Sequence, residues 1–346
     1  MTSVPAMLFD LIQAPLRWQV LNAGLQLDLF DHLTDGCDVA DLALSLGLDQ
    51  RRLMVVLDAL CAMELLDKQD CRYQLAASAA PYLRSDSDRS LRPMLQTLPL
   101  LRHADVLTVL RGEGAETPPD LSDPAFWDRS AASLRSFHRG MGADLMIGLL
   151  ESLPEWPSVR RVLDLGAGSE TLALRIVDQR PQRTVTVLDL PPLAARIAGA
   201  VDDRVRVISG DFNETDLGGP YELIWASMTL YFARDLTAVL RKARQALAAG
   251  GVFVSLHEGL TRERTAPESH VIGRLVPALR GVNVSFEHGQ IATALRQAGF
   301  AEVESRQVAT PFGLIELDVA RGGGLTGQGS RPGSVRQSLA NRRSAM

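Results

Sequence analysis

Residues 162–192, VLDLGAGSETLALRIVDQRPQRTVTVLDLPP, decide the fold of this chain. An apolar run typical of a buried strand ends just before Gly166, and a segment with helical periodicity follows Gly168. Glycine at these two positions permits a tight turn and a close approach of the backbone to a ligand. A second apolar run ends at Asp189, where an acidic side chain can accept hydrogen bonds from ribose hydroxyls. The stretch therefore predicts a nucleotide-binding βαβ unit.

The residues that follow Gly168 indicate the class of nucleoside. A dinucleotide site places a third glycine and a pyrophosphate at the helix start, whereas this chain has Ser169 and Glu170 there. A carboxylate at that position would repel a pyrophosphate but not a cation. ATP is disfavoured because no GK[ST] sequence follows. S-adenosylmethionine, with a sulfonium, an ammonium and a ribose, fits better; the alternative is that the glycines only form a turn and Asp189 caps a helix.

Outward from this stretch, strands alternate with helices from about residue 158, which is typical of a parallel α/β sheet. The expected strands are 161–165, 184–188, 205–208, 222–226 and 252–256. The expected helices are about 171–180, 193–200, 235–249 and 290–298, and an antiparallel pair, 301–305 and 312–319, closes the sheet edge.

Residues 8–110 have helical periodicity almost throughout. Within them, residues 39–75 read as a helix, a turn at Gly47, a longer helix and a hairpin, the outline of a winged helix-turn-helix. A DNA-binding domain would need a basic surface, but residues 37–75 carry four basic residues and seven carboxylates. We therefore expect a protein–protein role. The predicted divisions are a helical winged-helix domain at 1–110, a connector at 111–136, a ligand-binding domain at 137–320 and a disordered tail at 321–346.

The composition describes a globular protein. Of 346 residues, 46% are hydrophobic and 22% charged, and no apolar run approaches the ~18 residues that span a bilayer. A net charge of −5 gives no attraction to nucleic acid or an anionic membrane. Three cysteines without metal-ligand spacing predict a reduced cytoplasmic protein with no metal site.

In their order, these features resemble the bacterial and plant small-molecule O-methyltransferases. The matching segments are the N-terminal winged helix, VLDLGAGSE, VLDLPP, ISGDF and AGGVFVSLHEGL, and the likeness covers about residues 10–320. The resemblance implies a Rossmann-like class I methyltransferase domain preceded by a winged-helix dimerisation domain. It also implies a homodimer that binds S-adenosylmethionine and a small organic acceptor, with no nucleic acid or membrane partner.

The resemblance assigns the cofactor site residue by residue. The glycine-rich segment with Asp164, Gly166 and Gly168 would face the cofactor, and Asp189 would bind the ribose. The remaining implied contacts are Leu190 packing on the adenine, Asp211 hydrogen-bonding its amino group, Phe212 lying along it and Ser227 beside the methionine moiety.

The catalytic segment departs from the family. Where its members have a sequence like S-N-x-L-H-D-W, residues 227–233 read SMTLYFA, which places Tyr231 at the position of the family's histidine base. Tyrosine, with an ordinary pKa near 10, is a poor base at neutral pH. Ser285 aligns with the carboxylate that orients that histidine, while Glu258 matches another acidic position. Tyr231 is either a hydrogen-bonding group of the site or a tyrosine that only lines the pocket.

Other histidines could substitute. His257, at the end of the fifth strand beside Glu258, is the second catalytic candidate, and His138, His270 and His288 are more often bystanders. An acceptor would lie between residues 270–285, the helix at 131–150 and Tyr231. Three outcomes stay open: proximity-driven methyl transfer to an O, N or C nucleophile, S-adenosylmethionine chemistry without methyl transfer such as cyclisation or elimination, and non-catalytic binding.

Overall fold

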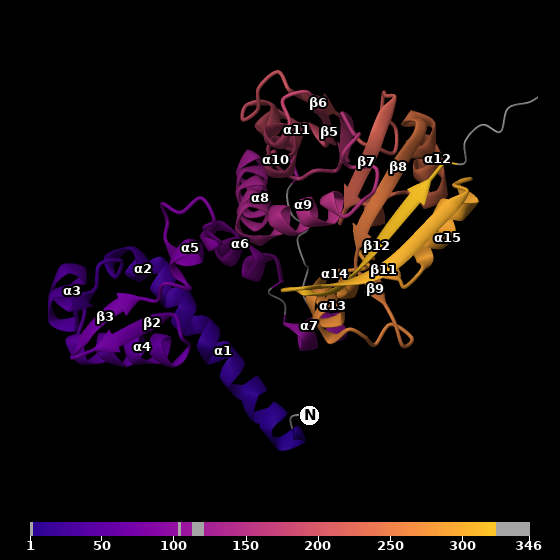
Figure 1. The fold of residues 1–346 in the computed structure, drawn as a ribbon. Helices are drawn as coiled ribbons and strands as arrows, with labels where there is room; N and C mark the ends of the chain where they lie inside the picture. Colours follow the sequence, from indigo (N-terminus) through magenta and orange to yellow (C-terminus); the bar gives the residue numbers. More distant parts are fainter. Residues whose placement is uncertain (1–2, 103–104, 113–120, 323–346) are drawn as a thin grey trace, which may run out of the picture.

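The computed structural model describes residues 3–102, 105–112 and 121–322 (Figure 1). Most of the predicted connector lies within these ranges, but residues 113–120 do not. The tail predicted to be disordered lies outside the described residues from 323 onward. Among the described residues, no helix combines the length and the hydropathy needed to cross a bilayer.

The N-terminal region is a small helical lobe with a three-stranded sheet. Aspartates cap two of its helices, since Asp38 accepts a hydrogen bond from the Ala40 N–H and Asp49 accepts one from the Arg52 N–H. Leucines of α3 and α4 meet β2 and β3 in one apolar core. The elements are α1 (Val4–Gln26), α2 (Leu29–His32), β1 (Cys37–Asp38), α3 (Val39–Leu46), α4 (Gln50–Ala62), β2 (Leu66–Gln69) and β3 (Arg72–Leu75), with strand order β1-β3-β2.

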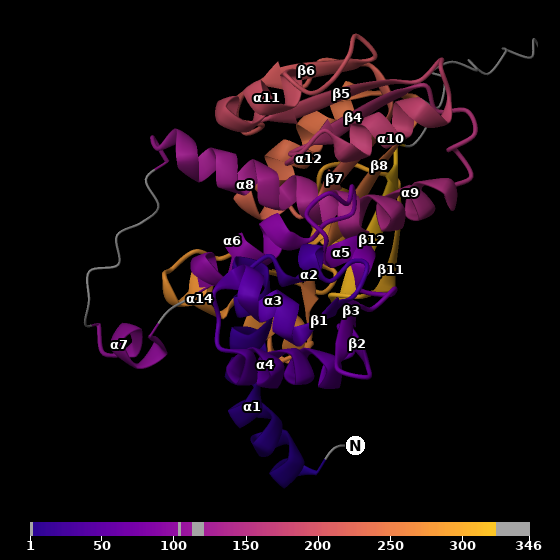
Figure 2. The ribbon, with the colours of Figure 1, turned by 90° about the vertical axis from the view of Figure 1, so that its left-hand side faces the viewer.

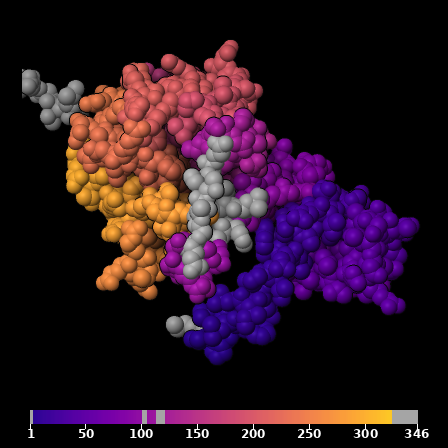
Figure 3. Space-filling model, turned by 180° about the vertical axis from the view of Figure 1, so that it is seen from behind, coloured from indigo at the N-terminus to yellow at the C-terminus, as the bar shows by residue number. Residues whose placement is uncertain are grey.

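Helix α1 projects from this lobe at its N-terminal end (Figure 1). Only its C-terminal part, around Leu25, enters the core. The space-filling view shows the N-terminal residues, in indigo, as a lobe apart from the orange and yellow sheet domain (Figure 3). Further helices lead toward that domain: α5 (Ala80–Leu83), α6 (Arg92–Arg102) and α7 (Val106–Leu110).

Helix α8 (Pro124–Phe137) joins the two parts, because it packs against α6 on one side and α11 on the other (Figure 2). It continues through a π-helical turn, His138–Gly142, into α9 (Ala143–Glu151). Single π-turns inside helices are frequent at functional sites. This turn lies directly against the glycine loop described below.

A seven-stranded sheet forms the C-terminal domain, with strand order β11-β12-β8-β7-β4-β5-β6. Five strands are parallel and the last two are antiparallel. The strands are β4 (Arg161–Leu165), β5 (Thr184–Asp189), β6 (Val205–Ser209), β7 (Tyr221–Ser227), β8 (Leu247–His257), β11 (Glu302–Thr310) and β12 (Gly313–Arg321). The helices are α10 (Thr171–Gln179), α11 (Pro191–Ala198), α12 (Leu236–Ala246), α13 (Glu268–Gly273), α14 (Leu275–Leu279) and α15 (Gln290–Gln297), and β9 (Gly259–Leu260) pairs with β10 (Phe286–Glu287).

Both faces of the sheet are covered by helices. One apolar core lies between the sheet and α9 and α10, and a second lies between the sheet and α12 and α15. The mixed α/β fold predicted from the sequence is confirmed. Some boundaries were wrong. The helix expected at 235–249 ends at Ala246 and the strand expected at 252–256 begins at Leu247, because Leu247 already pairs with Tyr221 in the sheet. The strand expected at 301–305 extends to Thr310, because its pairing with β12 continues to the turn before Gly313.

Candidate functional site

The carboxyl ends of β4, β5, β7 and β8 meet at one edge of the sheet, where ligands of open parallel sheets bind. After β4, Gly166 and Gly168 adopt φ values of 68° and 69°. A Cβ on Gly166 would lie 2.1 Å from Thr229 Oγ1, so the loop after β7 closes onto the glycine loop. Glycine is required here for both the backbone conformation and the close approach.

Asp189, the last residue of β5, is tied to the glycine loop. Its Oδ2 accepts a hydrogen bond from the Gly168 N–H at 2.7 Å, and its Oδ1 accepts one from the Leu190 N–H at 2.8 Å. Burial raises the pKa of this carboxyl, and the two backbone donors act against that rise. A carboxylate has about four lone-pair sites, so capacity for a ligand's hydroxyls is left.

Asp164 lies on β4, and its carboxyl interacts electrostatically with that of Asp189. It is buried, and its Oδ2 has no hydrogen-bond partner. Burial, followed by the charge of Asp189, raises its pKa to about 8. Two buried carboxyls that disfavour each other's ionisation are stabilised by a nearby cation. The sulfonium and ammonium of S-adenosylmethionine are such groups, so the residues present fit this cofactor.

Glu170 does not act as the sequence suggested. Its buried carboxylate accepts two hydrogen bonds from Arg135, at 2.6 and 3.0 Å, and lies 3.4 Å from Arg139. Burial would raise its pKa, but the two arginines lower it. Because its charge is paired, Glu170 cannot repel a pyrophosphate as an isolated carboxylate would, and the prediction of its role from the sequence was wrong.

The residues expected around the adenine follow β5 and β6. Leu190 is 42% exposed and presents an apolar surface beside Asp189. Phe212 is buried in the core between the sheet and α12. Asp211 accepts hydrogen bonds from Asn213 and pairs with Arg234 at 3.0 Å. Although burial raises the pKa of Asp211, these partners bring it below its ordinary value.

At the end of β7, the Ser227 Oγ is buried without a hydrogen-bond partner. The strand end is adjacent to Leu165 of β4 through its neighbour Ala226. An unsatisfied hydroxyl at the ligand-binding edge is available to a polar group of a ligand.

His257 holds the loop after β7 in place. Its Nε2 accepts hydrogen bonds from the Thr229 N–H at 3.0 Å and the Leu230 N–H at 2.9 Å, and its Nδ1 lies 3.0 Å from Ser255 Oγ. Since Nε2 accepts twice, Nδ1 carries the proton. Burial, followed by the charge of Arg274, lowers its pKa to about 3. Both nitrogens are engaged, so this geometry does not support the prediction of a catalytic role for His257.

Tyr231 lies on the same loop, edge-on to His257 with ring centroids 5.9 Å apart. Burial raises the pKa of its hydroxyl, while Arg274 lowers it and Glu258 raises it further. The Arg274 guanidinium lies 5.3 Å from the Tyr231 ring centroid, and its Nε donates to Glu258 Oε2 at 2.7 Å. Tyr231 is therefore a neutral phenol at pH 7 beside an ion pair.

The other candidate histidines are spread around this edge. His138, in the π-turn, lies 2.7 Å from Ser169 Oγ, and burial lowers its pKa to about 4. Both ring nitrogens of His270 are buried without a partner. His288 is half-exposed and lies 3.2 Å from Glu316. Among the described residues, no group of histidine, cysteine and acidic side chains could hold a metal ion.

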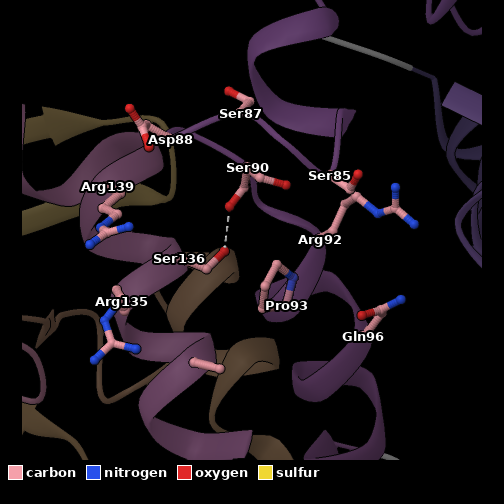
Figure 4. Close-up of a pocket in the computed structure, with 11 residues that line it drawn as sticks. Ser85, Ser87, Asp88, Ser90, Arg92, Pro93, Gln96, Arg135, Ser136 and Arg139 are labelled. Atoms are coloured by element: carbon pink, nitrogen blue, oxygen red, sulfur yellow. Dashed lines mark hydrogen bonds between the residues drawn. The ribbon is translucent and has the colours of Figure 1, made fainter. Parts of the chain in front are cut away.

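A hollow of about 400 Å³ lies away from this edge, between residues 85–96 and α8 (Figure 4). Ser136 Oγ, on α8, donates to the Ser90 carbonyl across it at 2.7 Å. Its arginines already have acidic partners: Arg92 pairs with Asp28 and Asp31, and Arg135 and Arg139 pair with Glu170. These three arginines are therefore engaged in ion pairs within the protein.

Sequence reasoning missed Arg135 and Arg274. Each lies far along the chain from its partner, 35 residues before Glu170 and 16 after Glu258. Neither arginine belongs to a motif or a charge pattern of its own segment, so no local signal marks it. Their roles follow from the packing of α8 and of the α13–α14 segment against the sheet edge.

Comparisons with known proteins agree with this architecture. Residues 9–85 match the model of the O-methyltransferase dimerisation domain, and residues 137–305 match a methyltransferase domain. The chain is 25% identical over 321 residues to a 3-hydroxy-5-methyl-1-naphthoate 3-O-methyltransferase of Streptomyces sahachiroi, covering 89% of this chain and 92% of the relative. It is 27% identical over 333 residues to the N,N-dimethyltransferase OxyT of Streptomyces rimosus, covering 88% and 93%.

Among solved structures, PigF with S-adenosylhomocysteine superposes with a TM-score of 0.71 at 24% identity, covering 93% of this chain and all of that one. At this identity the likeness shows the fold alone. The two domain matches, in this order and over this length, show more: the chain belongs to the small-molecule methyltransferases that join an N-terminal O-methyltransferase dimerisation domain to a methyltransferase domain.

Proposed function

We propose that this enzyme transfers a methyl group from S-adenosylmethionine to an oxygen, nitrogen or carbon nucleophile of a small secondary-metabolite or pigment-like acceptor. The observation that carries the proposal is the pair of buried carboxyls, Asp164 and Asp189, beside a glycine loop with positive φ. The relatives named above, an O-methyltransferase and an N,N-dimethyltransferase, support a small organic acceptor and leave its nucleophilic atom open.

The residues that would hold the cofactor have distinct tasks. The backbone at Gly166 and Gly168 would lie along it, and Asp189 would accept hydrogen bonds from the ribose. Leu190 would cover one adenine face, and Asp164 would balance the positive charge. When bound, S-adenosylmethionine supplies a methyl group on a cationic sulfur. The remaining contacts in this proposal are Asp211 with the adenine amino group, Phe212 along the ring and Ser227 with the methionine moiety.

On the acceptor side, the protein positions groups rather than removing a proton through residue 231. The neutral Tyr231 hydroxyl can hydrogen-bond the acceptor, but its raised pKa makes it a poor base. His257 fixes the loop that carries Tyr231 by accepting the Thr229 and Leu230 N–H groups. We therefore assign His257 a positioning role, and rate enhancement comes from proximity and alignment.

A homodimer is part of this proposal. Apolar side chains cover the projecting N-terminal end of α1, and Phe9, Ile12 and Leu16 are each at least 60% exposed. The matched dimerisation domain, residues 9–85, includes these side chains. Large contiguous apolar surfaces of this kind mark protein–protein contacts.

A product assay tests the proposed reaction. Pure protein is incubated with S-adenosylmethionine, alone and with a panel of phenols, enols and amines, and the adenosyl products are separated by chromatography. We expect S-adenosylhomocysteine only when an acceptor is present. Release of methylthioadenosine without an acceptor would instead indicate cyclisation or elimination chemistry. Tight cofactor binding without turnover across the panel would indicate a binding protein.

A further inference from the structure

Arg274 lies beside Tyr231, the residue at the position of the family's base. It lies between α13 and α14, and its guanidinium faces the Tyr231 ring at 5.3 Å. Its Nε donates to Glu258 Oε2 at 2.7 Å. Its side chain is 23% exposed, so it is neither free in solvent nor sealed in the core.

These contacts use only part of the arginine. A guanidinium has five N–H donors in a planar fork, so donors remain for a ligand beside Tyr231. A lone Glu258–Arg274 ion pair could serve only to fix the α13–α14 segment. The contact with the Tyr231 ring, however, places the guanidinium next to the residue that replaces the histidine base.

Three titratable side chains near the guanidinium, those of His257, His270 and Tyr231, are neutral at pH 7. Burial, followed by the charge of Arg274, lowers the pKa of His257 to about 3. Burial also lowers the pKa of His270 and raises that of Tyr231. Arg274 is therefore the cation that faces Tyr231 from the α13–α14 segment, and Glu258 offsets part of its charge.

We propose that Arg274 is the counter-ion of the acceptor, so that the site favours an acceptor whose oxygen is ionised when bound, such as an acidic phenol, an enol or a carboxylate. This inference rests on the proposed function and specifies its substrate class. A guanidinium forms short, charge-assisted hydrogen bonds to an anionic oxygen. A neutral alcohol or an amine gains no such interaction.

The arrangement explains how transfer proceeds without a base. The acceptor's proton is lost to water as the anion forms at the site, because a neighbouring cation lowers the pKa of an acid by about 1–3. A lone pair of the acceptor oxygen then forms the oxygen–methyl bond, and the electron pair of the breaking sulfur–methyl bond stays on sulfur. No proton is left for Tyr231 or His257 to remove.

A pair of chromogenic probes tests the inference without turnover. 4-Nitrophenol, whose ionised form absorbs at longer wavelength, and its neutral methyl ether, 4-nitroanisole, are each titrated into the protein saturated with S-adenosylhomocysteine. We expect at least about tenfold tighter binding of the phenolate and a pKa of the bound phenol about 1 below that of the free phenol. Titration with increasing probe concentration gives the two affinities, and the absorbance of bound 4-nitrophenol against pH gives its pKa.

Three variants and a control assign the effect to the guanidinium. Arg274→Gln should abolish the preference and the pKa decrease, while Arg274→Lys, which keeps the charge, should retain part of both. Glu258→Gln removes the offsetting charge and should lower the bound phenol's pKa further. The control is Arg264→Gln, which alters an exposed arginine in the loop before α13 and should leave the preference unchanged.

Equal affinity for the two probes in the unaltered protein, or affinity for neither, would overturn the inference. So would a phenolate preference that survives in Arg274→Gln. Calorimetry with S-adenosylhomocysteine, made on each variant before a phenol is added, shows that the cofactor site is intact. Failure of the proposed function appears as absence of cofactor binding in that first titration or as absence of methyl transfer in the product assay, and is thus separate from failure of the acceptor assignment.

Discussion

Asp164 links the charge of the cofactor to the protonation of the protein. With its pKa raised to about 8, this carboxyl is mostly protonated at pH 7 in the empty site. A bound cation favours the ionised form, so binding must release a proton. We expect the affinity for S-adenosylmethionine to increase as the pH rises from about 6 to 8. Calorimetry at pH 7 in buffers of different ionisation enthalpy measures the released proton directly.

The matching variant is Asp164→Asn, which has the same shape but cannot ionise. It should bind more weakly and show no dependence on the buffer. The same pKa has a consequence for folding: since the folded value lies above the ordinary 3.8, the empty protein should lose stability as the pH rises between about 4 and 8. A buffer-dependent binding enthalpy that persists in Asp164→Asn would show that another group releases the proton.

A Tyr231 variant tests whether the hydroxyl at the family's base position takes part in the reaction. Tyr231→Phe keeps the ring contacts with His257 and Phe286 and removes the hydroxyl. Because a phenol with a raised pKa is a poor base, we expect kcat to fall by less than about tenfold, against the 10²–10⁴ that loss of a general base costs. Steady-state kinetics over a range of pH decides. A loss above a hundredfold would make the hydroxyl catalytic.

At the scale of elements, the contact between the glycine loop and the loop after β7 can be broken by one methyl group. In Gly166→Ala, the new Cβ would meet Thr229 Oγ1 at 2.1 Å, in a backbone conformation with positive φ. We expect weaker cofactor binding and a lower melting temperature. The control is Gly148→Ala, in the middle of α9 with open space around it, which should be neutral or gain about 0.5–1 kcal/mol. Equal behaviour of the two variants would contradict this account.

The sheet and its cofactor edge could be predicted because their signals are local. The apolar run of β4 and the glycines after it occupy consecutive positions, and strand 161–165 has the expected bounds. Asp189 ends β5 as the pattern indicated. These features depend on periodicity and on backbone conformations that few residues adopt.

The partners of the charged groups could not be predicted. Glu170 follows the glycine loop in sequence, but its pairing with Arg135 depends on how α8 packs across the domain. His257 was expected to be a base because it lies at a strand end, and its two accepted hydrogen bonds depend on the fold of the loop after β7. Such contacts join segments that no short-range pattern relates.

At the scale of the whole molecule, the projecting helix α1 should form the dimer. We expect the double change Ile12→Glu and Leu16→Glu, at side chains 70% and 60% exposed, to convert the dimer to a monomer. Light scattering coupled to size-exclusion chromatography measures the mass. Leu44→Glu, which places the same charge at an 84% exposed leucine on α3, should leave the dimer intact.

A dimer that persists in the α1 double variant would place the interface elsewhere. A monomer in the unaltered protein would contradict the dimer itself. Neither result would contradict the proposed cofactor site, because Asp164 and Asp189 belong to the same chain and the same sheet edge.

The central claim is that this sheet edge binds an adenosyl cation through carboxyl groups and rejects a diphosphate. Titration calorimetry with S-adenosylhomocysteine, NAD and ATP tests it most directly, on the unaltered protein, on Asp189→Ala and on the exposed control Asp203→Ala. We predict that, of the three ligands, only S-adenosylhomocysteine binds. Its affinity should fall about tenfold to a hundredfold in Asp189→Ala, because hydrogen bonds to a charged group are lost. The affinity should be unchanged in Asp203→Ala. Uptake of NAD or ATP with no binding of S-adenosylhomocysteine would contradict the account.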